Sequence, residues 1–348
     1  MKALGSVGEF FALDVGTTSV RIVQLSRAGN VWNLVKYASV PVDIKIATSD
    51  AVDDQKKLGE IIMTAIGQSG VRTRNVVLGI PSNRMFATVV ELPEMPAAEL
   101  ASTIKYQAEQ FVPMSLDEAK IDWGVLGKSP KDPTKNEVLI ASVPNSFSEQ
   151  RLDLIEGLGL NVMALEPDPL AMCRSLLPAE SRNAHMIIDL GDFSTDLAMT
   201  LGDSPRLIRS IPTGFRSLTK AVSQNLNVQE AQAAQFLVKF GVDASKLEGQ
   251  IARAIDTTLD QFATDLIKSV KFFQTKYPEV PIDSLLLSGY ASTVPSMGEY
   301  LSAKVGIAAQ LATPWQRVRV STADQSALQP ISSQFAVVVG LAQRENHD

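Results

Sequence analysis

Two stretches of the chain share one pattern of apolar and polar positions. In residues 11–25, FALDVGTTSVRIVQL, an apolar run ends at Asp14, turns at a glycine two residues later and resumes as an alternating run. In residues 186–200, MIIDLGDFSTDLAMT, an apolar run ends at Asp189 and then follows the same course. Alternation with a period of two is typical of β-strands. Each stretch therefore predicts a β-hairpin, one near the start of the chain and one just past its middle.

The turn of each predicted hairpin is suited to an anion. Gly16 can adopt backbone angles that a side chain forbids, so the N–H groups of Thr17, Thr18 and Ser19 can converge on one anion. Asp14 lies beside them as a ligand for a hydrated cation. A single turn of this kind is usually an ordinary loop. Two of them, facing each other, predict a clamp for the phosphates of a nucleotide.

Apolar spacing predicts further elements along the chain. Residues 51–70 form an amphipathic helix with Ser49 and Asp50 as candidate N-caps, and residues 76–80 form a buried strand. A small α/β unit follows, with strands at 86–92, 119–126, 137–143 and 162–165 and helices at 97–111 and 147–158. The second half has helices at 168–177, 217–225, 229–240, 251–277, 294–305 and 335–344, a strand at 285–290 and a polar connection at 313–330.

The predicted helix at 251–277 has the most regular pattern. Its apolar positions are spaced by three or four residues with a period of eleven, which follows one face of a nearly straight helix rather than a coiled-coil seam. At 1.5 Å per residue it should extend for roughly 40 Å. We expect this face to pack in the core of one domain.

Composition excludes several classes of function. The net charge of −6 and the absence of a basic run argue against nucleic acid as a partner. Cys173 is the only cysteine, and His185 and His347 are the only histidines, so an internal disulfide, a Cys/His metal site and a histidine-dependent triad are not expected. No segment resembles a signal peptide or a membrane span. With 348 residues, two or more domains are expected in a soluble, cytoplasmic protein.

The duplicated hairpin resembles the actin and sugar-kinase superfamily. The small α/β unit inserted between the two hairpins is similar to that of the FtsA and PilM branch, and local strings resemble the PilM family of type IV pilus assembly. These strings are YQAEQFVPMSLDEAKID at 106–122, EPDPLA at 166–171, and the segments 313–317 and 335–342. The division protein FtsA is disfavoured because it ends in a basic amphipathic membrane helix, which this sequence lacks.

The resemblance implies an actin-like, two-domain α/β ATPase fold with a small inserted subdomain. Subdomain 1A would comprise residues 1–83, 166–185 and 331–348, the inserted subdomain 1C residues 84–165, subdomain 2A residues 186–214 and 282–330, and the helical subdomain 2B residues 215–281.

The resemblance also implies a site for ATP or ADP with Mg²⁺. Asp14 and Asp189 would bind Mg²⁺ through water, and Arg21 stands where the superfamily usually has a lysine near the β-phosphate. The remaining implied contacts are Gly16, Thr17, Thr18 and Ser19 with Gly191, Phe193 and Ser194 for the phosphates, Asp192 for the ribose, and Gly289 and Tyr290 for the adenosine.

Two departures affect the adenosine half of the site. Gly289 is followed by Tyr290 and Ala291 rather than by further glycine, so that a ring either stacks on adenine or blocks it. The helix before Gly241 reads AAQFLVKF and lacks the Glu and Lys pair that the family tends to carry. We therefore expect weak nucleotide binding with little or no ATP hydrolysis.

Two functions of different classes remain. The first is an adaptor that binds the cytoplasmic N-terminal peptide of PilN, an inner-membrane protein, and so associates with the membrane through that partner without an anchor of its own. The partner contacts expected on the helix at 97–111 are Ile104, Gln107, Glu109 and Phe111. The second is a sugar kinase or hydrolysing ATPase, for which the sequence shows no substrate signature. Self-association is compatible with either.

Overall fold

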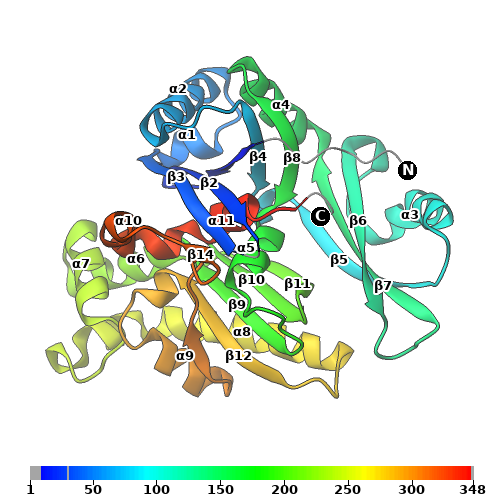
Figure 1. The fold of residues 1–348 in the computed structure, drawn as a ribbon. Coiled ribbons are helices and arrows are strands. Elements are labelled where there is room, and N and C mark those ends of the chain that lie inside the picture. The colour runs from blue at the N-terminus through cyan, green and yellow to red at the C-terminus, as the bar shows by residue number, and fades with distance from the viewer. Residues whose placement is uncertain (1–8, 30, 346–348) are drawn as a thin grey trace.

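The computed structural model describes residues 9–29 and 31–345, apart from the side chains of Gln107 and Ala108. It has three β-sheets with helices packed on them (Figure 1). In that view the six-stranded sheet, called the first sheet here, lies above the five-stranded second sheet. A three-stranded inserted sheet lies to their right.

The first sheet is built around the first hairpin. In spatial order its strands are β14 (Val318–Arg319), β3 (Val31–Pro41), β2 (Ser19–Ala28), β1 (Phe11–Val15), β4 (Asn75–Ile80) and β8 (Asn161–Pro167). β1 pairs antiparallel with β2 and parallel with β4. The predicted hairpin is confirmed.

Helices cover both faces of the first sheet. Successive side chains of β1 point to opposite faces of the sheet, so its apolar residues need a covering layer on each face. Phe11 and Leu13 pack with Leu58 and Ile62 of α2 (Val52–Ser69) on one face. The same face is covered by α1 (Ile44–Thr48) and α4 (Asn145–Gly157). On the other face, Ala12 packs with the C-terminal helix α11 (Ala336–Ala342).

The second sheet repeats this arrangement around the second hairpin. In spatial order its strands are β11 (Ser204–Ile211), β10 (Thr195–Leu201), β9 (Ala184–Leu190), β12 (Ile282–Gly289) and β13 (Ala309–Leu311). β9 pairs antiparallel with β10 and parallel with β12, just as β1 pairs with β2 and β4. The second predicted hairpin is also confirmed.

Four helices pack with the far face of the second sheet in one hydrophobic cluster. They are α6 (Phe215–Leu226), α7 (Glu230–Phe240), α8 (Gln250–Lys276) and α9 (Met297–Val305). All eight apolar residues that gave the eleven-residue period are buried, namely Ile251, Ile255, Leu259, Phe262, Leu266, Val270, Phe273 and Tyr277. The long helix and its buried face are confirmed. Residues 215–281, predicted as the helical subdomain 2B, share one hydrophobic cluster with the second sheet.

Two helices lie between the two large sheets. α5 (Asp168–Leu176) contributes Met172 and Cys173 to the near face of the second sheet, and α11 packs on the first. Burial raises the pKa of the Cys173 thiol to about 12. The helices meet backbone to backbone, because a Cβ atom at Gly340 would lie 1.8 Å from the carbonyl oxygen of Ala171.

The inserted sheet is smaller than the sequence predicted. Its strands, in spatial order, are β5 (Phe86–Pro93), β7 (Lys135–Pro144) and β6 (Ala119–Lys128), with α3 (Ala97–Phe111) on one face. The prediction assigned residues 84–165 to this unit, but β8 pairs parallel with β4 and α4 packs on the first sheet. A parallel neighbour requires a long crossover connection, and the inserted sheet lies within that connection.

The inserted sheet is joined to the second sheet by a buried polar cluster around Glu137, which we call the Glu137 junction. Glu137 of β7 is fully buried. Its carboxylate accepts hydrogen bonds from Arg206 Nε of β11 at 2.7 Å and from the Tyr277 hydroxyl at 2.5 Å. Lys276 Nζ lies 3.3 Å from the same carboxylate. We call each large sheet with its helices a unit, the first unit and the second unit. Three groups of the second unit thus bind one carboxylate of the inserted sheet.

Short elements account for the other differences from the prediction. α1, capped by Asp43, was not predicted, nor were β14 and α10 (Thr322–Leu328) inside the expected polar connection. The N-cap of α2 is Ala51 rather than Ser49 or Asp50. The 3-10 helices are η1 (Ser82–Arg84), η2 (Leu116–Glu118), η3 (Leu247–Gly249), η4 (Tyr290–Ser292) and η5 (Gln329–Phe335). His347 lies outside the described residues.

Candidate functional site: a cleft between two hairpins

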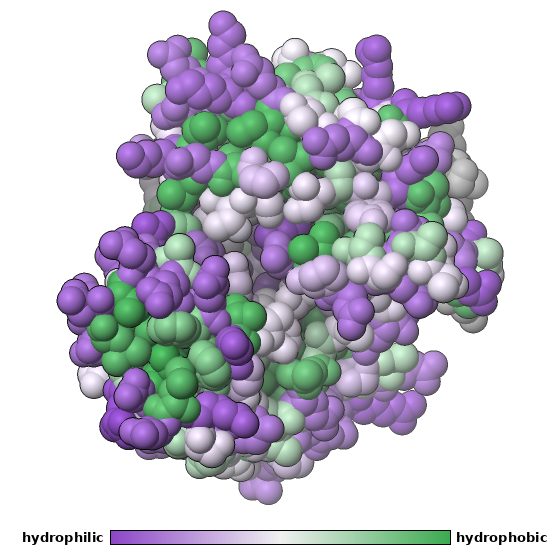
Figure 2. All heavy atoms as spheres, turned by 90° about the vertical axis from the view of Figure 1, so that its left-hand side faces the viewer, coloured by the Kyte–Doolittle hydropathy of each residue, from purple (hydrophilic) through white to green (hydrophobic). Residues whose placement is uncertain are grey.

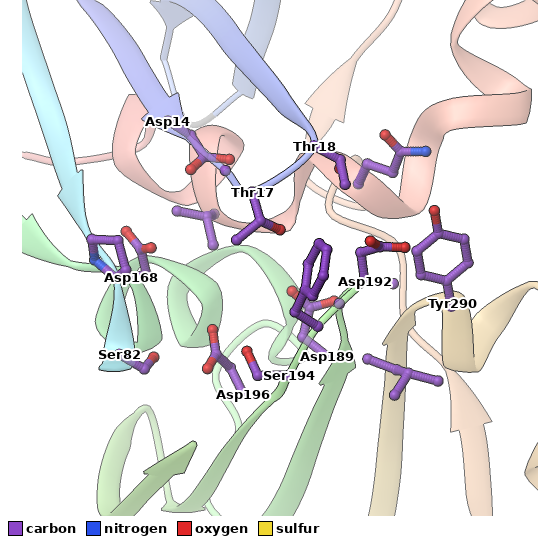
Figure 3. Close-up of a pocket in the computed structure, with 18 of the residues that line it drawn as sticks. Asp14, Thr17, Thr18, Ser82, Asp168, Asp189, Asp192, Ser194, Asp196 and Tyr290 are labelled. Atoms are coloured by element: carbon purple, nitrogen blue, oxygen red, sulfur yellow. The ribbon is translucent and has the colours of Figure 1, made fainter. Parts of the chain in front are cut away.

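A cleft lies between the two hairpins, and residues from both turns line it. In Figure 3, Asp14, Thr17 and Thr18 point down from the first hairpin toward Asp189, Asp192 and Ser194 of the second. Asp168 and Ser82 close one end, and Tyr290 lies at the other. Figure 2 shows the surface hollowed between the upper and lower parts of the molecule. The sequence-predicted residues of the two turns are therefore brought together, except Ser19, which is buried in β2 away from the cleft lining.

The first turn has two N–H groups that are available to a ligand. The Gly16 N–H donates to the carbonyl oxygen of Ser19 at 3.0 Å, which closes the turn. A Cβ atom at Gly16 would lie 2.7 Å from Arg21 Nη1, so a side chain here would displace the guanidinium from its place beside Asp14. Within the described chain, no group accepts a hydrogen bond from the N–H of Thr17 or Thr18. Such unpaired N–H groups at a tight turn suit a phosphate oxygen.

The second turn has the same geometry. The Gly191 N–H donates to the carbonyl oxygen of Ser194 at 2.9 Å, and a Cβ atom at Gly191 would lie 2.8 Å from that oxygen. The carbonyl groups of Gly191 and Asp192 accept hydrogen bonds from the first N–H groups of α6, each at 2.9 Å. The turn is therefore held on the start of a helix, and residues present in the cleft fit the phosphates of a nucleotide on both sides.

The two hairpins differ in the residue paired with their aspartate. Asp14 pairs across the hairpin with Arg21, and Asp189 pairs with Asp196 in the same register. Arg21 Nη1 donates to Asp14 Oδ2 at 2.9 Å, and both side chains are buried. Asp189 instead opposes a second carboxylate. The first hairpin therefore carries an ion pair where the second carries two acids.

Burial changes the protonation of these acids. It raises the pKa of Asp189 to about 7, with a contribution from the charge of Asp196, and it raises the pKa of Asp196 to about 6. The pKa of Asp14 is also raised by burial, although Arg21 opposes this. Burial likewise raises the pKa of Asp192. A cleft with several partly protonated carboxylates accepts phosphate groups more readily than one that is fully ionised.

Asp168, which the sequence did not indicate as a site residue, lines the cleft. It begins α5, and its Oδ1 atom is buried without a hydrogen-bond partner in the described chain. A Cβ atom at Gly79 would lie 2.2 Å from Oδ1, so this glycine makes room for it. Burial and the charges of Asp14 and Asp196 raise the pKa of Asp168 well above its ordinary value.

Other lining residues were also missed. Asp196, Ser82 and Gln334 line the cleft. Asp196 had a detectable signal, because it follows Asp189 by the same spacing as Arg21 follows Asp14 and therefore occupies the same place in its hairpin. Gln334 is far along the chain and had none.

Tyr290 forms one wall of the cleft. Gly289, at a φ of +61°, brings its backbone close to Leu190 and Asp189, since a Cβ atom would lie 2.4 Å from the Leu190 carbonyl oxygen. The Tyr290 ring stacks on Phe215 with centroids 4.1 Å apart and an interplanar angle of 9°. One face of the ring is thus covered by Phe215. Phe193 is held nearby by the Arg216 guanidinium, 5.2 Å from its ring centroid.

The expected magnesium ligands are less well placed than the phosphate turns. Asp14 and Asp189 both line the cleft, but the Asp14 carboxylate is already bound by Arg21. In the part of the chain that the structure describes, no group of three or more His, Cys, Asp or Glu side chains could hold a metal ion. An ion here would need most of its ligands from water and phosphate.

The expected partner contacts on α3 are divided between core and surface. Ile104 is 1% exposed and packs on the inserted sheet, so it does not face a partner, and Phe111 packs partly buried against the same cluster. Glu109 is exposed, and Tyr106 is 86% exposed. The side chain of Gln107 lies outside the described residues.

Sequence comparison assigns the family. The sequence model of the family described as type IV pilus assembly protein PilM matches residues 12–346. The chain belongs to the PilM family. Within residues 9–29 and 31–345, no helix is long and apolar enough to cross a membrane.

Solved structures similar to this PilM-family chain share its fold. A PilM–PilN type IV pilus biogenesis complex has a TM-score of 0.81 at 23% identity, covering 96% of this chain and 97% of that chain. The ethanolamine utilization protein EutJ from Carboxydothermus hydrogenoformans has a TM-score of 0.55 at 14% identity over 95% and 88% of the two chains. MreB 5 of Spiroplasma citri bound to AMPPNP has a TM-score of 0.55 at 11% identity over 96% and 95%. The predicted actin-like fold is confirmed.

Proposed function

We propose that the protein is an actin-like adaptor of type IV pilus assembly, which binds a nucleotide in the cleft and a PilN-like inner-membrane protein through that protein's cytoplasmic N-terminal peptide. The match of nearly the whole chain to the PilM family carries this proposal. Through such a partner the protein would be held at the inner membrane from the cytoplasmic side.

The nucleotide in this proposal is ATP or ADP. Its phosphates would lie between the two glycine turns, where Thr17 and Thr18 line the cleft and their N–H groups have no acceptor in the described chain. Arg21 would neutralise phosphate charge, since a guanidinium can bind Asp14 and still offer further donors. Asp192 would contact the ribose, and Tyr290 would contact the base. Magnesium coordinated through water by Asp14 and Asp189 stays a prediction.

The phosphate turns can be tested by calorimetry with ATP. Gly191→Val should weaken ATP binding at least tenfold, because its Cβ atom would press on the Ser194 carbonyl oxygen and distort the turn. Gly124→Ala is the control, since no atom lies within 4 Å of the Cβ position there. Equal ATP affinity in the wild type and Gly191→Val would place the nucleotide elsewhere.

The proposed peptide site lies where the inserted unit meets the first sheet. β8 is the last strand of the first sheet and β6 the last strand of the inserted sheet, so each presents backbone groups on one edge. An extended peptide can pair with such an edge and place alternate side chains in adjoining pockets. Met163 on β8 is 43% exposed. This apolar side chain suits an apolar residue of the peptide better than a charged one.

The partner proposal can be tested by measuring binding of a synthetic peptide with the N-terminal sequence of the PilN-like protein from the same organism. Met163→Glu should weaken peptide binding at least fivefold. Val238→Glu is the matched control, because Val238 is 50% exposed on α7 of the second unit. If the wild type does not bind the peptide, the adaptor function is wrong; if both variants bind like the wild type, the peptide docks elsewhere.

A further inference from the structure

One residue that lines the cleft comes from the last part of the chain. Gln334 belongs to η5 and follows Arg21 by 313 positions, yet its side chain reaches the Arg21 guanidinium. It is partly buried and lies at the cleft without belonging to either phosphate turn.

The backbone of η5 is anchored on both sides of Gln334. Before it, the carbonyl oxygen of Ser333 accepts a hydrogen bond from Ser288 Oγ of β12 at 3.4 Å. After it, Phe335 is fully buried, and its ring centroid lies 5.6 Å from that of Trp315. Gln334 is therefore held between the second sheet and the core of the first unit, so its side chain stays at the cleft.

Arg21 determines which way the amide of Gln334 points. A guanidinium has only donors, so the amide oxygen must face it, and Oε1 lies 3.5 Å from Arg21 Nη2. The amide nitrogen is on the other branch of the same planar group and points away from Arg21. Within the described residues, no atom accepts a hydrogen bond from this nitrogen. Gln334 therefore offers two N–H donors to a ligand.

The guanidinium beside this amide is fixed next to the first phosphate turn. Its Nη1 donates to Asp14 Oδ2 at 2.9 Å and lies against Gly16, where a Cβ atom would be 2.7 Å away. Its Nε is buried and has no partner in the described chain. A phosphate group that Arg21 binds is within reach of the Gln334 amide, because the two branches of one amide are separated by less than the length of a hydrogen bond.

The charges of the cleft favour a neutral donor at this place. Among the described lining residues, Arg21 is the only cationic side chain, against five aspartates. Binding of phosphate therefore depends on neutral N–H groups, whose hydrogen bonds are strengthened by the charge of the phosphate. A role in holding Arg21 explains the contact less well, because 3.5 Å is long for a hydrogen bond and the ion pair with Asp14 already fixes the guanidinium.

We propose that Gln334 is a phosphate-binding residue of the cleft, whose amide N–H groups donate to the same phosphate group as Arg21. The inference rests on the proposed binding of a nucleotide. It adds a third source of donors to the two hairpin turns, and it gives a segment near the end of the chain a direct part in binding the ligand.

The first test measures the dissociation constant of ATP by calorimetry. Gln334→Met keeps an unbranched side chain of similar length but cannot donate, so it should weaken ATP binding about tenfold. Gln329→Met is the matched control, because Gln329 is an exposed glutamine of the same η5 and does not line the cleft. This control should bind ATP like the wild type, and circular dichroism should show the same fold for both variants.

The second test separates direct contact from a role through Arg21. Arg21→Lys keeps the positive charge but has no second Nη for Gln334 to hold. In this background Gln334→Met should again weaken ATP binding about tenfold. A factor close to one in the Arg21→Lys background would mean that Gln334 only positions Arg21, and this result would overturn the inference.

The third test uses inorganic tripolyphosphate, which has no ribose or base. The side-chain amide signal of Gln334 in a ¹⁵N NMR spectrum can be assigned by its loss in Gln334→Met. It should shift when either ATP or tripolyphosphate is added. A shift with ATP alone would assign the amide to the adenosine half, and no shift with either would remove Gln334 from the site; both results contradict the proposal. If the wild type binds no ATP at all, the proposed nucleotide function is wrong, and this inference is wrong with it.

Discussion

At the residue scale, Arg21 and Asp196 occupy the same position in their hairpins but carry opposite charges. Arg21 is paired directly with Asp14, whereas Asp189 and Asp196 oppose each other, and the Arg21 charge only partly offsets the effect of burial on Asp189. The cleft is therefore more acidic than a site for phosphates alone would require. This acidity has a measurable consequence for stability.

Asp189→Asn should stabilise the protein at alkaline pH. The pKa of Asp189 is about 7 in the folded state against an ordinary value of 3.8, so the folded state binds more protons than the unfolded state between these values. The free energy of unfolding of the wild type therefore falls as the pH rises from about 4 to 7. Asparagine removes this loss. A shift of about three pKa units corresponds to a gain on the order of 4 kcal/mol at pH 8 and none at pH 4, which urea unfolding can measure.

The control for this experiment is Asp117→Asn, which changes an exposed carboxylate. It should leave the pH dependence of the free energy of unfolding as it is in the wild type. An Asp189→Asn protein that is less stable than the wild type at pH 8 would contradict the assignment of a raised pKa.

Tyr290 decides whether the adenosine half of the cleft is open. Because Phe215 covers one face of the ring and fixes its plane, the ring can serve as a stacking surface for a base. Tyr290→Ala should therefore weaken ATP binding by roughly 0.5 to 1.5 kcal/mol, about two- to tenfold. Tyr106→Ala, at an exposed position on α3, is the control for calorimetry. Tighter binding in Tyr290→Ala would mean that the ring blocks the base.

At the scale of elements, the close crossing of α5 and α11 connects the two large sheets. The helices approach so closely at Gly340 that no side chain fits. Gly340 O also accepts a hydrogen bond from Arg174 Nη1 at 2.8 Å. The close approach of the two helices between the sheets thus requires that residue 340 has no side chain.

Gly340→Ala should destabilise the protein by roughly 2 kcal/mol, because the added methyl group would force the helices apart. Gly67→Ala is the matched control within a helix, since no atom lies within 4 Å of its Cβ position. Alanine is the better helix former, so this control should be neutral or slightly more stable. Thermal unfolding followed by circular dichroism distinguishes the two, and equal midpoints would argue against the crossing.

The sequence predicted long elements better than short ones. α8 was predicted because 27 residues give its apolar face many repeats, whereas α1 and α10, with five and seven residues, have too few. The two hairpins were predicted because their turns and strands are local. β8 was assigned to the wrong sheet because a strand's parallel neighbour lies far away along the chain. Asp168 was missed for the same reason: only the packing of α5 between the sheets brings it to the cleft.

At the scale of the whole molecule, the two large units and the inserted sheet are held together at two places. The large sheets are joined through α5 and α11, and the inserted sheet is joined to the second unit through Glu137. None of these attachments follows from chain order. Together they predict that the wild type unfolds as one cooperative unit.

Glu137→Ala should uncouple the inserted sheet from the rest. Removing the carboxylate leaves Arg206 buried without its counter-charge, which should cost roughly 3 kcal/mol. Trp123 reports on the inserted sheet if Trp32 and Trp315 are replaced by phenylalanine, and circular dichroism reports on all helices. In the protein that carries only the two tryptophan replacements, the two signals should coincide during urea unfolding. When Glu137→Ala is added, they should separate. Asp260→Ala, which removes an exposed acceptor, should keep them coincident.

The buried thiol of Cys173 gives the protein a practical advantage. A thiol with a pKa near 12, enclosed between α5 and the second sheet, forms almost no thiolate at neutral pH and is out of reach of reagents in solution. A pair of cysteines introduced on the surface would then react with maleimide dyes or nitroxide spin labels while Cys173 stays unlabelled, without replacement of the native residue. Distances between the inserted sheet and either large unit become measurable in an otherwise unaltered chain.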